Sequence, residues 1–501
     1  MLLADVLAFL AVSASCMRAQ SWTRHFPAFA GPMAVVQYLL EGPRWQLLPA
    51  YTLTILFVFI SLRQRVVSQR DPITPSRRQE VLGFASRGLG ALGLIFAAGL
   101  PILVPVFRFA RPTGPYAIGT VTYNWVDASR SEAFGTDPSE RRQLLVQIWY
   151  PAQANRSAPR TLYMPDADAV TAVLARTQDT PSFFFGHFKY VTTSAMSSVP
   201  VAVDQARYPV LFFLEGATGF RQMNTFQVEH LVSHGYIVIA IDQPGAAAVV
   251  VFPDGHEATG LTIPQFHAMV RPSYMPSGSD SPQKRVLLPN GTTLQDNSII
   301  PYLAQDVIFA LDQLDALKHA DSSGILAGRL DLQRIGVFGV SLGGIVAGDA
   351  CRMDARLRAC LVLDAAMPAV VVREGLRQPA MWITRDAASM RLERQQAGGW
   401  PEAEIEAHQT SMRTVYDGLS GDGYFVRVPG MFHLNFTDVP SWTPLARPLG
   451  LSGPIGAQRA HGIVNAYSLA FFDKHLLGRP APLLDGPATQ YPDVLFESRW
   501  P

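Results

Sequence analysis

The hydrophobic and polar positions follow two different patterns along the chain. From about residue 111 onward, short apolar runs rich in β-branched and aromatic residues alternate with longer amphipathic stretches. Short runs of this kind are typical of strands, and the stretches at 223–233, 301–317 and 458–475 are typical of helices. This alternation predicts a mainly parallel sheet with helices on both faces. The eight predicted strands are 121–126, 144–150, 208–214, 236–241, 334–340, 359–363, 380–384 and 424–428.

The first 110 residues predict a membrane region of about four hydrophobic helices. Segments 26–40, 47–62 and 88–107 contain no charged side chain, and 1–17 contains only Asp5. A helix that spans a bilayer needs about 20 mainly apolar residues. Arginines concentrate in the loops that follow segments 1–17 and 47–62. This predicts that these two loops face the cytoplasm and that residues 111–501 lie outside. A signal peptide at 1–17 and a soluble helical domain are the alternatives.

Residues 111–501 are expected to form one catalytic domain with two insertions. Segments 152–207 and 243–300 are too long for simple connections and predict lids or binding walls. The aromatic cluster at 181–188 is expected in the core rather than in a pocket. Cys351 and Cys360 are expected as buried free thiols, and a bridge between them stays open. The formal net charge of +1 gives no basis for nucleic-acid binding.

The sequence Gly339-Val340-Ser341-Leu342-Gly343 is the strongest indication of chemistry. It lies between the predicted strand 334–340 and a helix-compatible stretch, as in the nucleophile elbow of an α/β-hydrolase. The glycines are needed because the chain turns so sharply that side chains beside Ser341 would collide. The pattern therefore predicts that Ser341 is a nucleophile in an α/β-hydrolase fold.

A serine nucleophile needs a base and an acid, which in this fold follow it in the order Ser, Asp, His. Asp364 follows the predicted strand 359–363, and His433 follows the strand 424–428. Both therefore fall at strand ends in the expected order. Asp386, after the strand 380–384, is the alternative acid, and Asp364 would then cap a helix. His230 and His234 lie four residues apart without a glutamate between them, which is a weak metal signal.

Together these residues resemble the type II platelet-activating-factor acetylhydrolases and their bacterial relatives. Ser341, Asp364 and the H-x-x-F-x-D run of His433, Phe436 and Asp438 carry the resemblance, with the opening segments 112–119 and 147–151. It extends over roughly residues 112–498. It implies hydrolysis of esters with short or truncated acyl chains, without a metal or a cofactor.

Two backbone N–H groups must stabilise the oxyanion that forms during acyl transfer. Leu342, directly after the nucleophile, is expected to supply one. The resemblance implies Ala217 as the second, because the loop after the strand 208–214 matches a His-Gly-Leu-Gly segment of the family. In this chain Glu215 stands in place of the histidine.

The leading hypothesis is a membrane-anchored serine ester hydrolase that acts on small-molecule or lipid esters through an acyl-enzyme. We expect it in a bacterial inner membrane, with its catalytic domain outside the cytoplasm. Three alternatives stay open: a cutinase-like esterase for polyesters or xenobiotic esters, an acyltransferase, and a catalytically inactive membrane scaffold with the hydrolase fold.

Overall fold

The computed structural model of the protein describes most of the chain, in two compact units. The described residues are 26–67, 77–137, 139–155, 157–274, 286–287, 293–294, 299–317, 321 and 323–500. A helical unit comprises Met1–Phe107, Pro181–Val191 and Trp442–Leu445, and a sheet unit comprises Arg108–Thr180, Thr192–Ser441 and Ala446–Pro501.

The sheet unit is built on an 11-stranded mixed sheet with the order β15-β14-β13-β12-β11-β5-β6-β2-β1-β4-β3. All eight predicted strands are present, but the predicted number was wrong because the short strands β3, β4 and β15 extend the two edges. The neighbouring strands from β6 through β14 are parallel, while β2 and β15 pair antiparallel with β6 and β14. The strands are β1 (Ala117–Ser131), β2 (Arg141–Ala152), β3 (Arg160–Leu162), β4 (Thr192–Ser197), β5 (Tyr208–Leu214), β6 (Ile237–Asp242), β11 (Leu330–Val340), β12 (Leu357–Leu363), β13 (Ala380–Thr384), β14 (Gly423–Arg427) and β15 (Leu495–Arg499).

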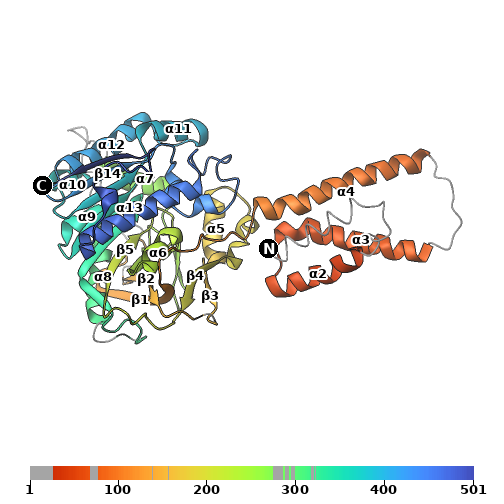
Figure 1. The fold of residues 1–501 in the computed structure, drawn as a ribbon, viewed down its shortest axis with the longest axis horizontal. Coiled ribbons are helices and arrows are strands. Elements are labelled where there is room, and N and C mark those ends of the chain that lie inside the picture. Colours follow the sequence, from red (N-terminus) through yellow and green to blue (C-terminus); the bar gives the residue numbers. More distant parts are fainter. Residues whose placement is uncertain are drawn as a thin grey trace. The chain divides into compact units, whose positions relative to one another are not determined.

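Helices cover both faces of this sheet and bury its central strands (Figure 1). Every residue of β5, β6 and β13 is buried, as expected for strands enclosed on two sides. One core cluster joins the sheet to α8 (Ile299–Leu317), α9 (Leu342–Met353), α10 (Ala369–Glu374) and α12 (Glu402–Asp417). A second joins it to α6 (Thr225–Ser233) and α13 (Ala457–Leu477). The predicted α/β arrangement is thus confirmed.

The two predicted insertions contain regular structure of their own. Segment 152–207 contributes β3, β4 and the helix α5 (Ala167–Thr177). Segment 243–300 contains a hairpin of β7 (Val249–Val251) and β8 (Glu257–Thr259), the helix α7 (Ile263–Tyr274), and a hairpin of β9 (Val286–Leu287) and β10 (Thr293–Leu294). The first insertion therefore widens the sheet rather than forming only a lid, because β4 pairs parallel with β1.

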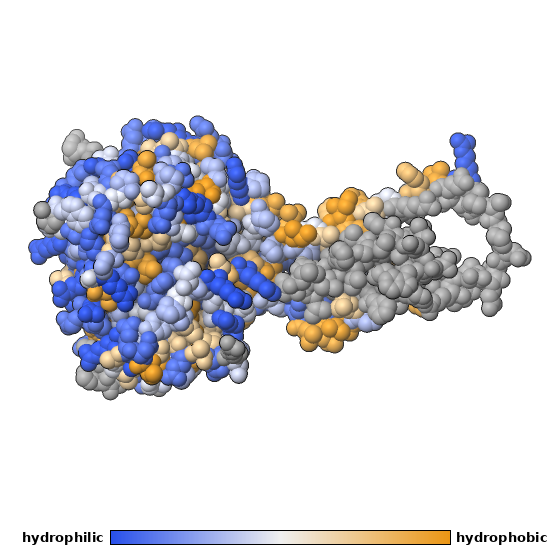
Figure 2. Space-filling model, in the orientation of Figure 1, coloured by the Kyte–Doolittle hydropathy of each residue, from blue (hydrophilic) through white to orange (hydrophobic). Residues whose placement is uncertain are grey.

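The helical unit contains α2 (Phe26–Glu41), α3 (Leu48–Val67) and α4 (Arg77–Leu103). Ala50 and Leu53 of α3 pack against Leu94 and Ala97 of α4. Many other apolar side chains of the three helices are exposed, and Figure 2 shows hydrophobic residues gathered on their described parts. Within the described ranges, no helix is both long enough and apolar enough to cross a bilayer. The described helices therefore do not support the predicted transmembrane region, and segment 1–17 lies outside them.

The aromatic cluster at 181–188 belongs to the helical unit. Trp45 lies 5.4 Å from Phe183 and 5.2 Å from Phe184, measured between ring centroids, and Phe188 lies 4.9 Å from Trp442. Phe188 is buried, whereas Phe183 is 56% exposed. The expectation of a core cluster thus holds for Phe188 but is wrong for Phe183, which lies at the edge of the stack.

Candidate active site

Ser341 lies at the sharp turn between β11 and α9. Its φ of 56° is in the left-handed region, where a non-glycine residue is strained and is commonly found at functional sites. The flanking glycines allow this turn, since a Cβ on Gly339 or Gly343 would collide with neighbouring backbone atoms and one on Gly344 would lie 2.7 Å from the Cβ of Ala365. The local structure is therefore a nucleophile elbow.

Asp364 occupies the corresponding position at the end of the neighbouring strand. Val340 and Leu363 are register partners in the pairing of β11 with β12, and the Ser341 N–H donates to the Leu363 carbonyl at 3.0 Å. The fully buried carboxylate of Asp364 contacts His433, whose Nδ1 lies 2.6 Å from Oδ2. The structure thus brings the predicted acid and base together beside the elbow.

The carboxylate of Asp364 receives three further hydrogen bonds. The Thr384 hydroxyl donates to Oδ1 at 2.8 Å, the Arg385 N–H donates to Oδ1 at 3.2 Å, and the Arg385 Nε donates to Oδ2 at 2.8 Å. Burial opposes ionisation, but the charge of Arg385 and the hydrogen bond from His433 outweigh it and hold the pKa of Asp364 far below its ordinary value. Asp364 is therefore a carboxylate throughout the neutral pH range.

Arg385 and Glu393 complete this arrangement, although no sequence motif indicates a role for either of them. Arg385 forms an ion pair with Glu393, and Glu393 accepts a hydrogen bond from the His433 backbone N–H at 3.0 Å. The guanidinium also lies 4.6 Å from the Trp400 ring, which packs 5.3 Å from the imidazole of His433. The only signal in the sequence was the position of Arg385 directly after a predicted strand.

Asp386, the alternative acid, has a different role in the structure. It is the N-cap of α11 (Ala387–Ala397), where its side chain accepts a hydrogen bond from the Ser389 N–H at 3.1 Å. A side chain that caps a helix in this way satisfies a backbone donor of the first turn. The structure therefore brings Asp364, and not Asp386, into contact with His433.

The loop that carries His433 is fixed by two other polar residues. Asn435 accepts hydrogen bonds from the N–H groups of Phe432 and Gly453, both at 2.8 Å. Asp438 accepts from the N–H groups of Thr225 and Phe226 at the first turn of α6, at 2.8 and 3.0 Å. Asp438 thus joins the His433 loop to a helix that packs on the sheet.

The two predicted oxyanion donors lie in the elbow itself and in the loop after β5. Leu342 is the first residue of α9, where an N–H group has no carbonyl acceptor in its own helix. Gly216 packs so closely on the elbow that a Cβ there would lie 3.3 Å from the Ser341 Cβ. The N–H groups of Thr218 and Gly219 donate to the carbonyls of Ala246 and Gly216, while in the described residues the Ala217 N–H has no backbone acceptor.

Glu215, at the start of this oxyanion loop, is buried with an exposure of 1%. Its Oε1 accepts a hydrogen bond from the Gln243 N–H at 3.3 Å, while its Oε2 has no hydrogen-bond partner. Burial, together with the nearby charge of Asp242, raises its pKa well above the ordinary range. The site therefore favours the protonated form of this side chain over the carboxylate.

The remaining predictions concern the nucleophile's base, the thiols and metals. In the described residues there is no hydrogen bond between the Ser341 hydroxyl and His433, an interaction that in many hydrolases tightens only when substrate is bound.

Cys351 and Cys360 are both free and buried. No group of three or more His, Cys, Asp or Glu side chains could hold a metal ion in the part of the chain that the structure describes.

Comparison with known proteins identifies the family. The family model described as platelet-activating factor acetylhydrolase, isoform II, matches residues 104–259 and 316–479. The platelet-activating factor acetylhydrolase of Cavia porcellus is 24% identical, with 66% of this chain and 72% of that protein aligned. A probable 1-alkyl-2-acetylglycerophosphocholine esterase of Arthroderma benhamiae is also 24% identical, over 78% of this chain and 94% of that protein.

A solved structure extends the similarity to the fold. The ferulic acid esterase from Streptomyces cinnamoneus superposes with a TM-score of 0.57 and 28% sequence identity, over 78% of this chain and 99% of that chain. The mixed sheet with helices on both faces fits the α/β-hydrolase fold of such esterases. The chain therefore belongs to the family of the platelet-activating factor acetylhydrolase, isoform II, and is a carboxylic ester hydrolase.

Proposed function

We propose that the protein hydrolyses esters of short or truncated acyl chains, such as platelet-activating-factor-like phospholipids, with Ser341, His433 and Asp364 as its catalytic triad. The observation that carries this proposal is the 2.6 Å contact between His433 Nδ1 and the buried Asp364 carboxylate, beside the strained elbow of Ser341. The choice of substrate is supported by the two relatives, a platelet-activating factor acetylhydrolase and a probable 1-alkyl-2-acetylglycerophosphocholine esterase.

In the proposed mechanism, Ser341 Oγ attacks the ester carbonyl while His433 Nε2 takes the hydroxyl proton. Asp364 holds the imidazole with Nδ1 protonated and stabilises the imidazolium that forms. The N–H groups of Ala217 and Leu342 stabilise the negative charge on the carbonyl oxygen. The imidazolium then protonates the leaving alcohol, and an acyl-enzyme remains. His433 next takes a proton from water, which attacks the acyl-enzyme and releases the acid.

A second substrate class is favoured by the structural neighbour. That protein is a ferulic acid esterase, and its identity to this chain, 28%, is higher than the 24% of the two acetylhydrolase-type relatives. The indole of Trp400 beside His433 offers a surface for an aromatic acyl group. We therefore place aryl and xenobiotic esters second to phospholipid esters.

We also propose that residues 1–110 hold the enzyme at a membrane. The support is the number of large apolar side chains that α2, α3 and α4 expose, among them Leu39 at 74%, Phe59 at 64% and Ile95 at 66%. Soluble proteins rarely expose so much contiguous apolar surface. Contact with a lipid bilayer would remove these apolar side chains from water.

The first prediction concerns the nucleophile. Ser341→Ala should lose hydrolysis of nitrophenyl acetate and labelling by a fluorophosphonate, because no other hydroxyl lies at the elbow. The matched control is Ser420→Ala, which removes a hydroxyl from the loop before β14. Initial rates for acetyl, hexanoyl and hexadecanoyl esters, an acetyl-glycerophosphocholine and methyl ferulate would then rank the substrates. Full activity in Ser341→Ala would refute the triad.

The second prediction separates the two candidate acids. Asp364→Asn should lower kcat/KM for a soluble ester by roughly 10⁴-fold, because an amide would not hold the imidazole in the reactive tautomer. Asp386→Asn should change it only a few-fold, since asparagine is an equally good N-cap. Circular dichroism would verify that both variants fold. A larger loss at Asp386 would reverse the assignment.

The third prediction concerns the protonation of Glu215. In the unfolded chain Glu215 loses its proton above pH ~4.3, whereas in the folded protein it keeps that proton to a higher pH. The free energy of unfolding therefore falls by ~1.4 kcal/mol per pH unit as pH rises, until Glu215 ionises in the folded protein as well. Glu215→Gln removes this decline. The free energy of unfolding of the variant minus that of the native protein should therefore increase between pH 5 and pH 7.

Denaturant unfolding at a series of pH values measures this difference. Glu229, whose pKa burial raises to about 7, contributes the same decline to both proteins and cancels in the comparison. The exposed Glu406→Gln variant is the control and should run parallel to the native protein. Parallel curves for Glu215→Gln would mean that Glu215 is ionised in the folded state.

The fourth prediction concerns the membrane. A triple variant with Leu39, Phe59 and Ile95 each replaced by lysine should shift the protein from the membrane fraction to the supernatant, because a charge in the bilayer costs roughly 2.5–3.5 kcal/mol per residue. The control places lysines at Val126, Val203 and Leu449, exposed apolar positions of the sheet unit. Equal fractionation of the two variants would contradict the proposal.

A further inference from the structure

A cavity of about 610 Å³ opens at the opposite edge of the sheet from Ser341. Its walls come from the beginnings of strands and the ends of helices: Arg334 lies near the start of β11, Arg358 near the start of β12, and Cys351 and Leu476 at the ends of α9 and α13. Arg358 and Asp364 are six residues apart on one strand, which corresponds to roughly 20 Å. The cavity is therefore separate from the candidate active site.

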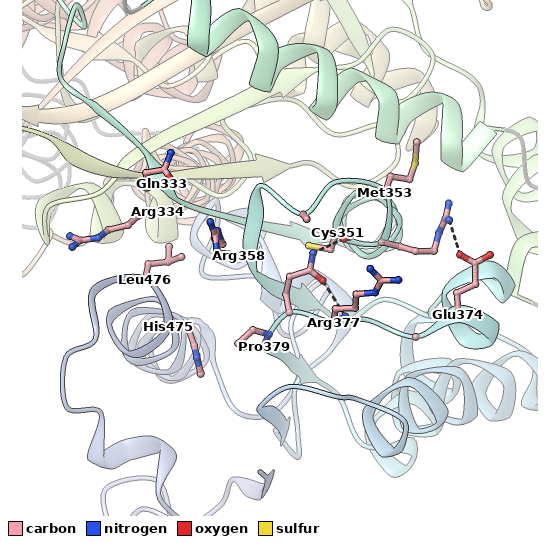
Figure 3. Close-up of a pocket in the computed structure, with 14 residues that line it drawn as sticks. Gln333, Arg334, Cys351, Met353, Arg358, Glu374, Arg377, Pro379, His475 and Leu476 are labelled. Atoms are coloured by element: carbon pink, nitrogen blue, oxygen red, sulfur yellow. Dashed lines mark hydrogen bonds and ion pairs between the residues drawn. The ribbon is translucent and has the colours of Figure 1, made fainter. Parts of the chain in front are cut away.

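Four arginines line this cavity, and Figure 3 shows three of them, Arg334, Arg358 and Arg377, on different segments around it. Two of the four have acidic partners. Arg352 pairs with Asp349 at 2.8 Å and with Glu374 at 2.9 Å, and Arg334 lies 3.6 Å from Asp331. Arg358 and Arg377 have no carboxylate within 4.0 Å among the described residues. Arg358 and Arg377 are thus the two lining guanidinium groups without a carboxylate partner, while Arg352 has two such partners.

The charges around the cavity nearly balance as a whole, because four guanidinium groups face three carboxylates and two helix ends. The C-termini of α9 and α13 each carry about half a negative charge, together about one. The amide of Gln378 already bonds one of those carbonyls, that of Cys351, at 2.6 Å. Burial lowers the pKa of His475 to about 4, so its imidazole is neutral at pH 7 and adds no charge. The lining arginines available to an anion are therefore the two unpaired ones, Arg358 and Arg377.

We propose that this cavity is a binding site for a phosphate monoester. Two guanidinium forks match the oxygen geometry and the double charge of such a group. The cavity is also larger than a bare phosphate needs, and its apolar walls of Met353, Pro379 and Leu476 would accept an attached organic group. The phosphate monoester belongs either to a soluble metabolite or to the headgroup of an anionic lipid.

The experiment uses the full-length protein and titrates three probes: inorganic phosphate, glycerol 3-phosphate, and vesicles of phosphatidylcholine with or without phosphatidic acid. Calorimetry should give saturable binding of glycerol 3-phosphate, of the phosphatidic acid vesicles, or of both. The double variant Arg358→Gln with Arg377→Gln should weaken that binding at least 10-fold and leave ester hydrolysis unchanged, because neither residue is near Ser341. Unchanged hydrolysis also verifies that the variant folds.

The matched control is Arg373→Gln, an exposed arginine of α10 that does not line the cavity. Binding of glycerol 3-phosphate alone identifies a soluble ligand, and binding of phosphatidic acid vesicles alone identifies a lipid headgroup. No saturable binding to any probe would overturn the proposal. Equal affinity in the native protein and the double variant would overturn it as well.

Discussion

The buried carboxylate of Asp364 is the interaction on which the rest of the site depends. A charge removed from water is costly unless it is paired and hydrogen-bonded. Here four donors meet that cost: the Thr384 hydroxyl, the Arg385 N–H, the Arg385 guanidinium and His433 Nδ1. Because Arg385 also pairs with Glu393, and Glu393 bonds the His433 backbone, the imidazole is held at both its ring and its main chain. The position of His433 therefore depends on the carboxylates of Asp364 and Glu393.

Glu215 in the oxyanion loop is also a buried acid, but it lacks the donors that stabilise the Asp364 carboxylate. Glu215 lies close to the Asp242–Arg221 ion pair, and one guanidinium cannot neutralise two buried carboxylates. Burial and the charge of Asp242 raise the pKa of Glu215, whose Oε2 has no hydrogen-bond partner. A protonated Glu215 would stand where the family has a histidine without placing a negative charge in the loop.

The sequence predicted those features that local patterns determine. All eight central strands and the elbow of Ser341 were recognised, because a buried parallel strand and a glycine-flanked turn each leave a continuous signature. The edge strands β3 and β15 were missed because they are short or half-exposed and lack that signature. Arg385 and Glu393 were missed because their roles arise from contacts between segments far apart in the chain. The choice between Asp364 and Asp386 was open for the same reason, since both follow strands and only tertiary structure decides which one meets His433.

The two edges of the sheet meet opposite ends of the helices that connect parallel strands. Helices between parallel strands run opposite to the strands, so α9 begins at Ser341 and ends at the cavity, where its carbonyls attract cations. Arg352 in the last turn of α9, with Asp349 and Glu374, meets that structural need. Arg358 and Arg377 are not required for it, because Gln378 already satisfies the Cys351 carbonyl. Arg358 and Arg377 therefore leave two unpaired guanidinium groups at this edge, where the proposed phosphate monoester would bind.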